Sequence, residues 1–246
     1  MDETSPPAEA TRPIAPEPEP EPRWRQTLRL MTGEAWALGA LTAVLWIVSG
    51  VQLLGKTQGW DETMLALGSL YPPYFRQGFW WTPLTHIFLH GGLLHIVMNT
   101  SALVSLGPAI AVRLGRDLKG ALLFWTFFLI CGLAGGLLFL VLHWNGEISA
   151  VGASGAICGL WGAVARLTPD GGLTPILSSQ VGKQTWSFIV MNLVLVAIGF
   201  GLGMASGEGG LMIAWECHVG GFIAGLFLVE MFPARYWWLR QPARTD

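Results

Sequence analysis

The chain has few charged residues and few cysteines. Charged residues make up 12% of its 246 positions, whereas a soluble domain carries about 25%, and this excludes an ordinary soluble protein. The net charge of −2 at pH 7 offers no basic surface for a nucleic acid. Cys131, Cys158 and Cys217 all lie in apolar segments, so they form neither a disulfide framework nor a cysteine-rich zinc motif. We therefore expect an integral membrane protein.

The first residues lack a basic start followed by an apolar run, so we do not expect a cleaved signal peptide. They are rich in proline and glutamate up to Pro22 and cannot bury enough apolar surface to fold. A juxtamembrane stretch follows, in which Trp24 is accompanied by Arg23, Arg25 and Arg29. We expect a disordered cytoplasmic tail over residues 1–30, a membrane domain over 31–235 and a short cytoplasmic tail over 236–246.

Six apolar segments follow the tail. They lie at about Ala35–Leu54, Leu93–Val112, Ala121–Leu142, Ala153–Leu167, Trp186–Gly203 and Trp215–Phe232. A helix needs about 20 residues to cross about 30 Å of hydrocarbon, so the fourth segment is short and must begin below the membrane surface. The pattern predicts an all-α membrane protein built as a six-helix bundle.

Basic residues orient this bundle. With the N-terminus inside, the outer side keeps only Lys56 and Arg76, and every other Lys and Arg falls inside. We expect both termini in the cytoplasm and, because no Arg- and Ser-rich presequence is present, a bacterial inner membrane. The outer loop at about 56–92 contains many aromatic residues and is expected to lie partly in the membrane interface. These aromatics are Trp60, Tyr71, Tyr74, Phe75, Phe79, Trp80 and Trp81.

Four polar side chains lie at the outer ends of three segments. Ser154 stands among glycines, which is typical of a nucleophile but also of a small-residue packing face. His95 and Asn99 open the second segment and His218 opens the sixth. The second, fourth and sixth segments all run from outside to inside, so the four residues reach a similar depth. Ionisable groups inside a membrane are costly, and their convergence favours an active site.

Glycines beside these residues predict close helix packing. Gly221 and Gly225 share a face with His218, and Gly155 and Gly159 lie beside Ser154. Gly152 belongs to the same group of small residues near the site. Close approach would allow a serine–histidine hydrogen bond of roughly 2.6–3.2 Å. Glu216 points to another side of its helix than His218, and Glu147 and Glu208 lie in outer loops, so a hydrolase here would use a Ser–His dyad.

The remaining polar residues are interpreted as structural. His86, His90 and His95 have spacings of four and five, but no carboxylate or thiol joins them, so we predict no metal and no cofactor. His143 is interpreted as a solvated histidine at a helix end, and Asn192 as a helix-packing hydrogen bond. Cys217 is assigned to packing because it faces away from the neighbouring His218.

In these motifs the chain resembles the rhomboid intramembrane serine proteases, over about Trp80–Val229. The motifs are Gly152-x-Ser154-Gly155, His218-x-x-Gly221-x-x-x-Gly225 and His95-x-x-x-Asn99, in that family's order and spacing. The resemblance implies a six-helix bundle that cleaves transmembrane segments of other membrane proteins. It also implies that Ser154 is the nucleophile and His218 the general base. His95, Asn99 and the Ser154 backbone N–H would then form the oxyanion hole.

Two positions depart from the family pattern. Thr82 follows Trp81 where the family usually has arginine, which concerns the anchoring of the loop more than the chemistry. Cys158 stands where an aromatic residue commonly stacks on the base histidine, so His218 loses that stack or contacts the sulfur instead.

Two other functions fit a protein of this kind. A non-catalytic rhomboid-like binder of transmembrane segments usually lacks the serine or the histidine, and both are present here. A small transporter is expected to have internal repeats and broken helices, and the six segments show no repeat. The predicted partners are therefore single-pass or multi-pass membrane protein substrates within the lipid bilayer. The sequence predicts no particular substrate and no oligomeric state.

Overall fold

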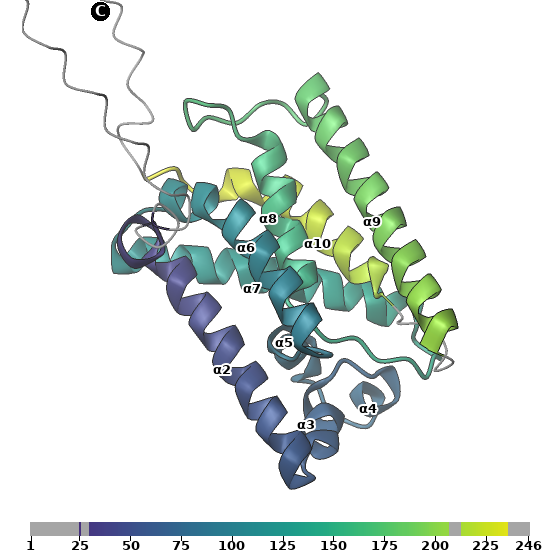
Figure 1. Ribbon diagram of the computed structural model, residues 1–246. Coiled ribbons are helices and arrows are strands. Elements are labelled where there is room, and N and C mark those ends of the chain that lie inside the picture. The colour runs from purple at the N-terminus through teal and green to yellow at the C-terminus, as the bar shows by residue number, and fades with distance from the viewer. Residues whose placement is uncertain (1–24, 26–29, 207–212, 236–246) are drawn as a thin grey trace, which may run out of the picture.

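The fold is an assembly of helices (Figure 1). A computed structural model describes residues 25, 30–206 and 213–235. Most of the tail expected over 1–30, and all of the one over 236–246, lie outside these residues. Within them regular structure is helical, apart from isolated bridges that join Leu70 to Ala150 and Leu167 to Leu173. This agrees with the all-α class that the apolar segments predict.

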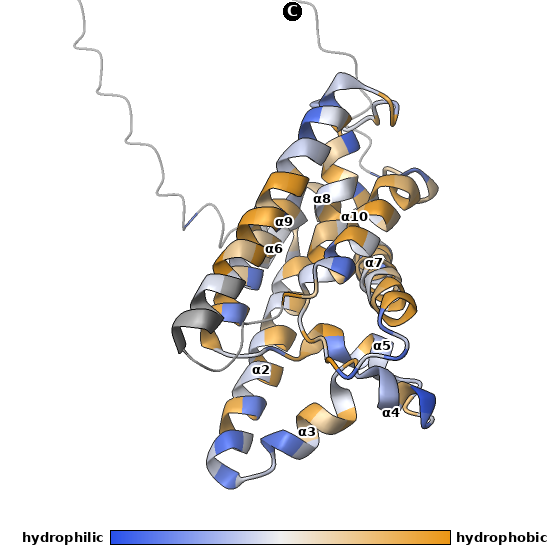
Figure 2. Cartoon of the chain, turned by 90° about the vertical axis from the view of Figure 1, so that its right-hand side faces the viewer, coloured by the Kyte–Doolittle hydropathy of each residue, from blue (hydrophilic) through white to orange (hydrophobic). Residues whose placement is uncertain are grey.

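Four helices are long and apolar enough to cross a membrane: α2 (Trp36–Gln58), α6 (Leu93–Leu114), α7 (Leu118–Leu142) and α9 (Ser179–Ser206). A π-helical turn, η1 (Leu30–Glu34), precedes α2. Figure 2 shows hydrophobic residues along α7 and α9, including on the side that faces the viewer. The side chains of Val141 on α7 and Leu193 on α9, for example, are 72% and 65% exposed. Exposed apolar surface on this scale is stable against lipid rather than water, so the chain is an integral multi-pass membrane protein.

Two shorter helices lie at the centre of the bundle. They are α8 (Ser154–Arg166) and α10 (Trp215–Leu228), with 13 and 14 residues. At 1.5 Å per residue each is about 20 Å long, less than the hydrocarbon thickness. The prediction that the fourth segment is short is confirmed by α8. The sixth was predicted too long, because α10 ends at Leu228 and gives way to the 3₁₀ turn η3 (Val229–Met231).

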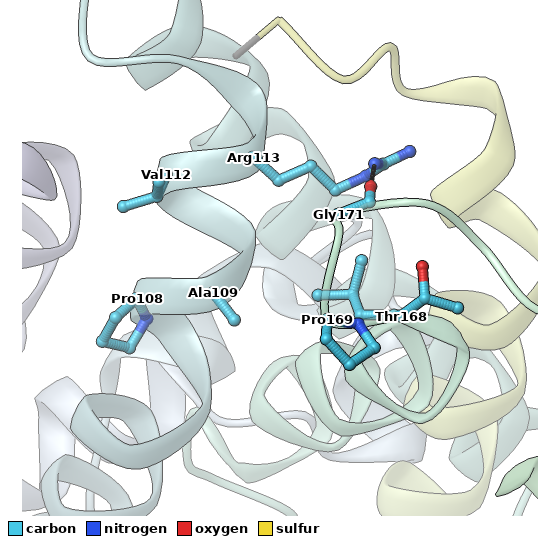
Figure 3. A pocket seen from close by; sticks show the side chains of 8 residues that line it. Pro108, Ala109, Val112, Arg113, Thr168, Pro169 and Gly171 are labelled. Carbon is cyan, nitrogen blue, oxygen red and sulfur yellow. Dashed lines mark hydrogen bonds between the residues drawn. The ribbon is translucent and has the colours of Figure 1, made fainter. Parts of the chain in front are cut away.

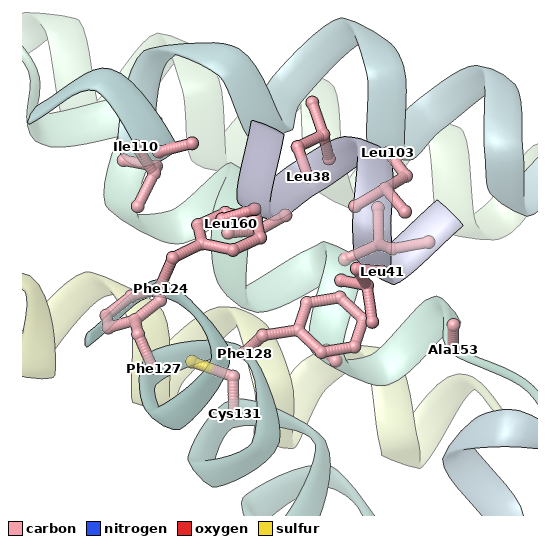
Figure 4. Close-up of a cluster of buried hydrophobic side chains, with 14 of the residues drawn as sticks. Leu38, Leu41, Leu103, Ile110, Phe124, Phe127, Phe128, Cys131, Ala153 and Leu160 are labelled. Carbon is pink, nitrogen blue, oxygen red and sulfur yellow. The ribbon is translucent and has the colours of Figure 1, made fainter. Parts of the chain in front are cut away.

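The central helices are buried by their neighbours. α8 and α10 pack along each other and against α7, while α6 covers α8 (Figure 1). Phe124, Phe127 and Phe128 of α7 lie among Leu41 of α2 and Leu160 of α8, and all five side chains are fully buried (Figure 4). A dense core of this kind fixes where the ends of α8 and α10 lie.

The segment between α2 and α6 folds into short helices. These are α3 (Asp61–Gly68), α4 (Pro72–Arg76), α5 (Thr82–Thr85) and the 3₁₀ turn η2 (His86–Phe88). They lie together below α7 in Figure 1, and we call this side the loop end of the bundle.

Several contacts anchor the loop end without an arginine at position 82. The buried Thr82 donates its hydroxyl to the Phe79 carbonyl, at 2.9 Å. The Trp81 indole donates to Leu67, and the Thr85 hydroxyl to Gly68, each at 2.8 Å. The side chain of Gln52 bonds to both backbone polar groups of His90. Leu70 exchanges two backbone hydrogen bonds with Ala150, which joins this region to the segment before α8.

Ion pairs hold the opposite end of the bundle. Arg166 of α8 bonds Glu230 in η3 at 2.7 Å. Asp117 caps α7 by accepting the Gly120 N–H, and it pairs with Arg235. The hydrogen bond from Arg235 lowers the pKa of Asp117 to about 2. The pKa of Arg235 is raised by the same contact. This pair is exposed to solvent, so its contribution to stability is small and is screened by salt.

Candidate active site

Ser154 and His218 are hydrogen-bonded at the loop end of the bundle. Ser154 is the first residue of α8, and His218 lies in the first turn of α10. The Ser154 Oγ is 2.8 Å from the His218 Nε2. His218 is only 6% exposed, whereas Ser154 is half-buried, so the histidine lies inside the bundle and the serine nearer to its surface. The N-terminal ends of α8 and α10 therefore lie together.

Glycines set the separation of α8 and α10. A methyl group built on Gly221 would overlap the carbonyl of Gly155, and one on Gly225 would overlap the carbonyl of Gly159. On α8, a methyl group at Gly155 would lie 3.0 Å from the Cys217 carbonyl oxygen. The two backbones are therefore in direct contact along the face that carries Ser154 and His218. Larger residues at these positions would move the histidine away from the serine.

His95 and Ser154 both lie next to Gly152. Gly152 has a φ of 124°, in the range that favours glycine. A methyl group there would be 2.8 Å from the His95 Nε2 and 3.8 Å from the Ser154 Oγ. The His95 Nδ1 accepts the Gly91 N–H at 3.2 Å, so in the neutral ring the proton is on Nε2. His95 therefore directs an N–H toward the space around Ser154.

Asn99 is buried one turn further along α6. Its Nδ2 donates to the His95 carbonyl at 2.9 Å, and its Oδ1 has no partner within the described residues. An amide nitrogen carries two protons, so one N–H of Asn99 is left for another acceptor.

His218 has a second partner that the sequence interpretation missed. The Oδ1 of Asn192, on α9, is 2.6 Å from the His218 Nδ1. The helix-packing hydrogen bond predicted for Asn192 does exist, but its partner is His218. The sequence indicates only that Asn192 shares a face of α9 with three other residues, because Gln180, Gln184, Phe188 and Asn192 recur every four residues, and this spacing does not show what the face contacts.

His143 was wrongly interpreted as solvated. Its Nε2 is 2.6 Å from the Glu216 Oε1, and Glu216 is buried. The reason is that α7 extends to the N-terminus of α10, so its C-cap residue meets the first turn of that helix. The carboxylate of Glu216 is thereby held by His143, on a different side from His218.

The other candidates occupy structural positions. His86 is buried, with its Nδ1 3.1 Å from the Thr82 carbonyl oxygen, and its own carbonyl accepts the Gly152 N–H. His90 and His95 pack ring to ring at 5.1 Å. Cys217 packs in a buried cluster with Leu70 and Phe139. In the described part of the chain no three His, Cys, Asp or Glu side chains are grouped as metal ligands.

A cavity of about 310 Å³ lies away from this site. It is formed by α6 and the segment after α8, and its lining includes Pro108, Arg113 and Pro169 (Figure 3). These residues belong to the ends of α6 and α8 opposite to His95 and Ser154. The cavity therefore contributes nothing to the Ser154–His218 pair.

Comparisons with known proteins point to one family. The family model of the Rhomboid domain matches residues 77–235, more than half of the chain. Rhomboid protease GluP of Bacillus subtilis is 29% identical over 166 residues, which are 68% of this chain and 29% of that protein. RHOMBOID-like protein 5 of Arabidopsis thaliana is 30% identical over 167 residues, 68% of this chain and 48% of that protein. Rhomboid-like protease 3 of Toxoplasma gondii is 27% identical over 170 residues, 69% of this chain and 58% of that protein.

The chain spans less than half the length of the first two relatives. The matched region contains all four polar residues that the sequence places at the helix ends, together with the glycines that hold α8 against α10. On these grounds the chain belongs to the rhomboid family.

Proposed function

We propose that this chain is an intramembrane serine endopeptidase that cleaves transmembrane segments of other membrane proteins. The observation that carries the proposal is the 2.8 Å contact between the Ser154 Oγ and the His218 Nε2 inside a membrane bundle. A serine hydroxyl is a weak nucleophile unless a base within hydrogen-bond reach takes its proton. A small-residue packing face needs no such partner.

In the proposed reaction His218 is the general base and Ser154 the nucleophile. Nε2 takes the hydroxyl proton while Oγ attacks the scissile carbonyl carbon, and the resulting imidazolium then protonates the leaving amine. Water, activated by the same nitrogen, afterwards hydrolyses the acyl-serine ester and restores the hydroxyl. The close contact between α8 and α10 keeps Ser154 and His218 within hydrogen-bond distance during both acylation and deacylation.

The oxyanion would be held by His95, Asn99 and the Ser154 backbone. The Nε2–H of His95 is directed toward the serine, and Asn99 has one amide N–H left after bonding the His95 carbonyl. The Ser154 N–H is at the N-terminus of α8, where the first backbone donors have no intrahelical partner and the helix dipole favours negative charge. Three donors of this kind stabilise charge that develops only in the transition state.

The distribution of Lys and Arg along the chain supports a location for this enzyme. The membrane domain over 31–235 would lie in a bacterial inner membrane between two cytoplasmic tails, with the loop end of the bundle toward the outer side. Substrates would be membrane proteins reached within the bilayer, and the reaction would use neither cofactor nor metal.

The test is cleavage of a membrane-embedded substrate by the purified protein in liposomes. Ser154→Ala should abolish cleavage with little change in thermal stability, and His218→Ala should abolish it in protein that is still folded at the assay temperature. The double variant should lose hardly more than either single one, because members of one catalytic unit are not additive. A chelator should leave the parent rate unchanged. Cleavage that survives in Ser154→Ala and is blocked by a thiol reagent would instead indicate a cysteine enzyme.

A further inference from the structure

We propose that Asn192 positions His218 for proton transfer, so that the site works as a row of three side chains from α8, α10 and α9. This inference rests on the proposed peptidase function and adds a residue to it. In that row Ser154 bonds one ring nitrogen of His218, and Asn192 bonds the other.

The orientation of the Asn192 amide follows from its second contact. Its Nδ2 is 2.9 Å from the backbone carbonyl oxygen of Phe188. A carbonyl oxygen only accepts hydrogen bonds, so the NH₂ group must face Phe188 and the Oδ1 must face His218. The contact of 2.6 Å therefore joins an acceptor oxygen to the His218 Nδ1, and Nδ1 must carry the proton.

This assignment leaves His218 in the tautomer that a general base needs. With the proton on Nδ1, Nε2 has a free lone pair directed at the Ser154 hydroxyl, 2.8 Å away. The opposite tautomer would place N–H against O–H and block proton transfer. After the transfer, the Asn192 oxygen still faces the Nδ1–H of a ring that now carries a positive charge.

The carboxylate nearest to His218 along the chain is not available for this role. Glu216 is two residues from His218, but its carboxylate bonds His143 at 2.6 Å. An amide is suited to this position because it accepts a hydrogen bond without bringing a second charge into the bundle.

Asn192 is itself held in place by α9. The same face of α9 carries Gln180, whose amide donates to the Ala165 and Leu167 carbonyls, and Gln184, which accepts the Trp161 indole N–H at 2.9 Å. Phe188 stacks on Phe222 of α10 with ring centroids 4.1 Å apart. Asn192 comes one turn after Phe188, so the stacking of Phe188 on Phe222 determines where its Oδ1 lies, while the two glutamines hold α9 further along the helix.

The experiment compares Asn192→Leu, Asn192→Asp and Gln184→Leu with the parent protein in liposomes. Gln184→Leu is the matched control, because it also removes one interhelix hydrogen bond of α9 but does not touch His218. The measurements are kcat/KM for a membrane-embedded substrate from pH 5 to 10, the rate at which a fluorophosphonate labels Ser154, and the thermal midpoint. The pH profile separates positioning from packing, since loosened packing does not move it.

Asn192→Leu should reduce both kcat/KM and the labelling rate by about 10- to 100-fold, the cost of one lost hydrogen bond to a group that becomes charged. Asn192→Asp keeps an acceptor but adds negative charge, which favours the imidazolium. Its activity should recover at high pH, with the acid limb of the profile moved upward. Gln184→Leu should lower the thermal midpoint as much as Asn192→Leu while its pH profile stays at the parent position.

Two results would overturn the inference. One is an Asn192→Leu protein whose kcat/KM and labelling rate match those of Gln184→Leu. The other is an Asn192→Asp protein with the acid limb of the parent. Either result would leave the peptidase proposal standing as long as the parent cleaves and Ser154→Ala does not. A parent protein that neither cleaves nor is labelled would instead refute the proposed function.

Discussion

Replacing Gly221 with alanine tests whether the contact between α8 and α10 controls the chemistry. The new methyl group would lie 2.7 Å from the carbonyl carbon of Gly155 and would overlap its oxygen. Carbon and oxygen atoms approach to about 3.3–3.6 Å even in close backbone contacts. The clash is with backbone on both sides, so no side-chain rotation relieves it, and the two helices must separate by more than about 1 Å.

That separation is large compared with the tolerance of the site. His218 is one turn before Gly221 on α10, and its hydrogen bond to Ser154 is 2.8 Å long. A displacement of about 1 Å stretches the contact beyond hydrogen-bond reach, and misplacement of this size costs about 10²-fold in rate. Overpacking also destabilises the fold, by about 1–3 kcal/mol. Gly221→Ala should therefore lose roughly two orders of magnitude in kcat and also melt earlier than the parent.

The assay is cleavage in liposomes at a temperature well below the melting midpoint of the variant. Gly50→Ala is the matched control, since a methyl group at Gly50 of α2 meets nothing within 4 Å. That variant should keep the parent rate and at least the parent stability, because alanine is favoured over glycine in a helix. If Gly221→Ala retained the parent kcat, the close contact between α8 and α10 would not be what positions His218 against Ser154.

Three further predictions follow from the orientation, the oxyanion donors and the Asp117–Arg235 pair. In intact cells, cysteines placed near positions 20 and 240 should be shielded from an impermeant thiol reagent and one near position 65 should be labelled; labelling at either terminus would reverse the orientation. His95→Ala and Asn99→Ala should each lower kcat by about 10²–10³-fold while a small reactive probe still labels Ser154; parent rates with a lowered melting temperature would assign both residues to packing. Because its pKa is lowered from 3.8 to about 2, Asp117 stabilises the fold above pH 4 and loses this contribution as the pH falls toward 2. Asp117→Asn, which still caps α7, should thus melt earlier than the parent at pH 7 and level with it near pH 2; a gap that is unchanged at pH 2 would exclude the ion pair as its cause.

Apolar composition and length predict the long helices well, except that α9 begins at Ser179 and not at Trp186, because polar residues precede its apolar part. The second and third segments were placed to within three residues at each end, and α8 was predicted to be short. The order of the segments also placed Ser154, His218 and His95 at one end of the bundle. The end of α10 was missed because the apolar run continues past Leu228, and hydrophobicity does not distinguish an α-helix from the 3₁₀ turn that follows.

Partners across the bundle could not be predicted in the same way. Asn192 and His143 are polar residues in apolar surroundings, and the sequence alone shows that each needs a hydrogen bond. Which group satisfies it depends on the rotation of α9 and on where α7 ends, and these are fixed by packing. The stacking of Phe188 on Phe222 directs Asn192 at His218, and the length of α7 places His143 against Glu216.

The most direct test of the central claim is to label the purified protein with a fluorophosphonate and to identify the modified residue by mass spectrometry. A hydroxyl reacts with this probe only when a base activates it. We expect a single modification at Ser154, and no modification in His218→Ala. A modification at another residue, or unchanged labelling of Ser154 in His218→Ala, would contradict it.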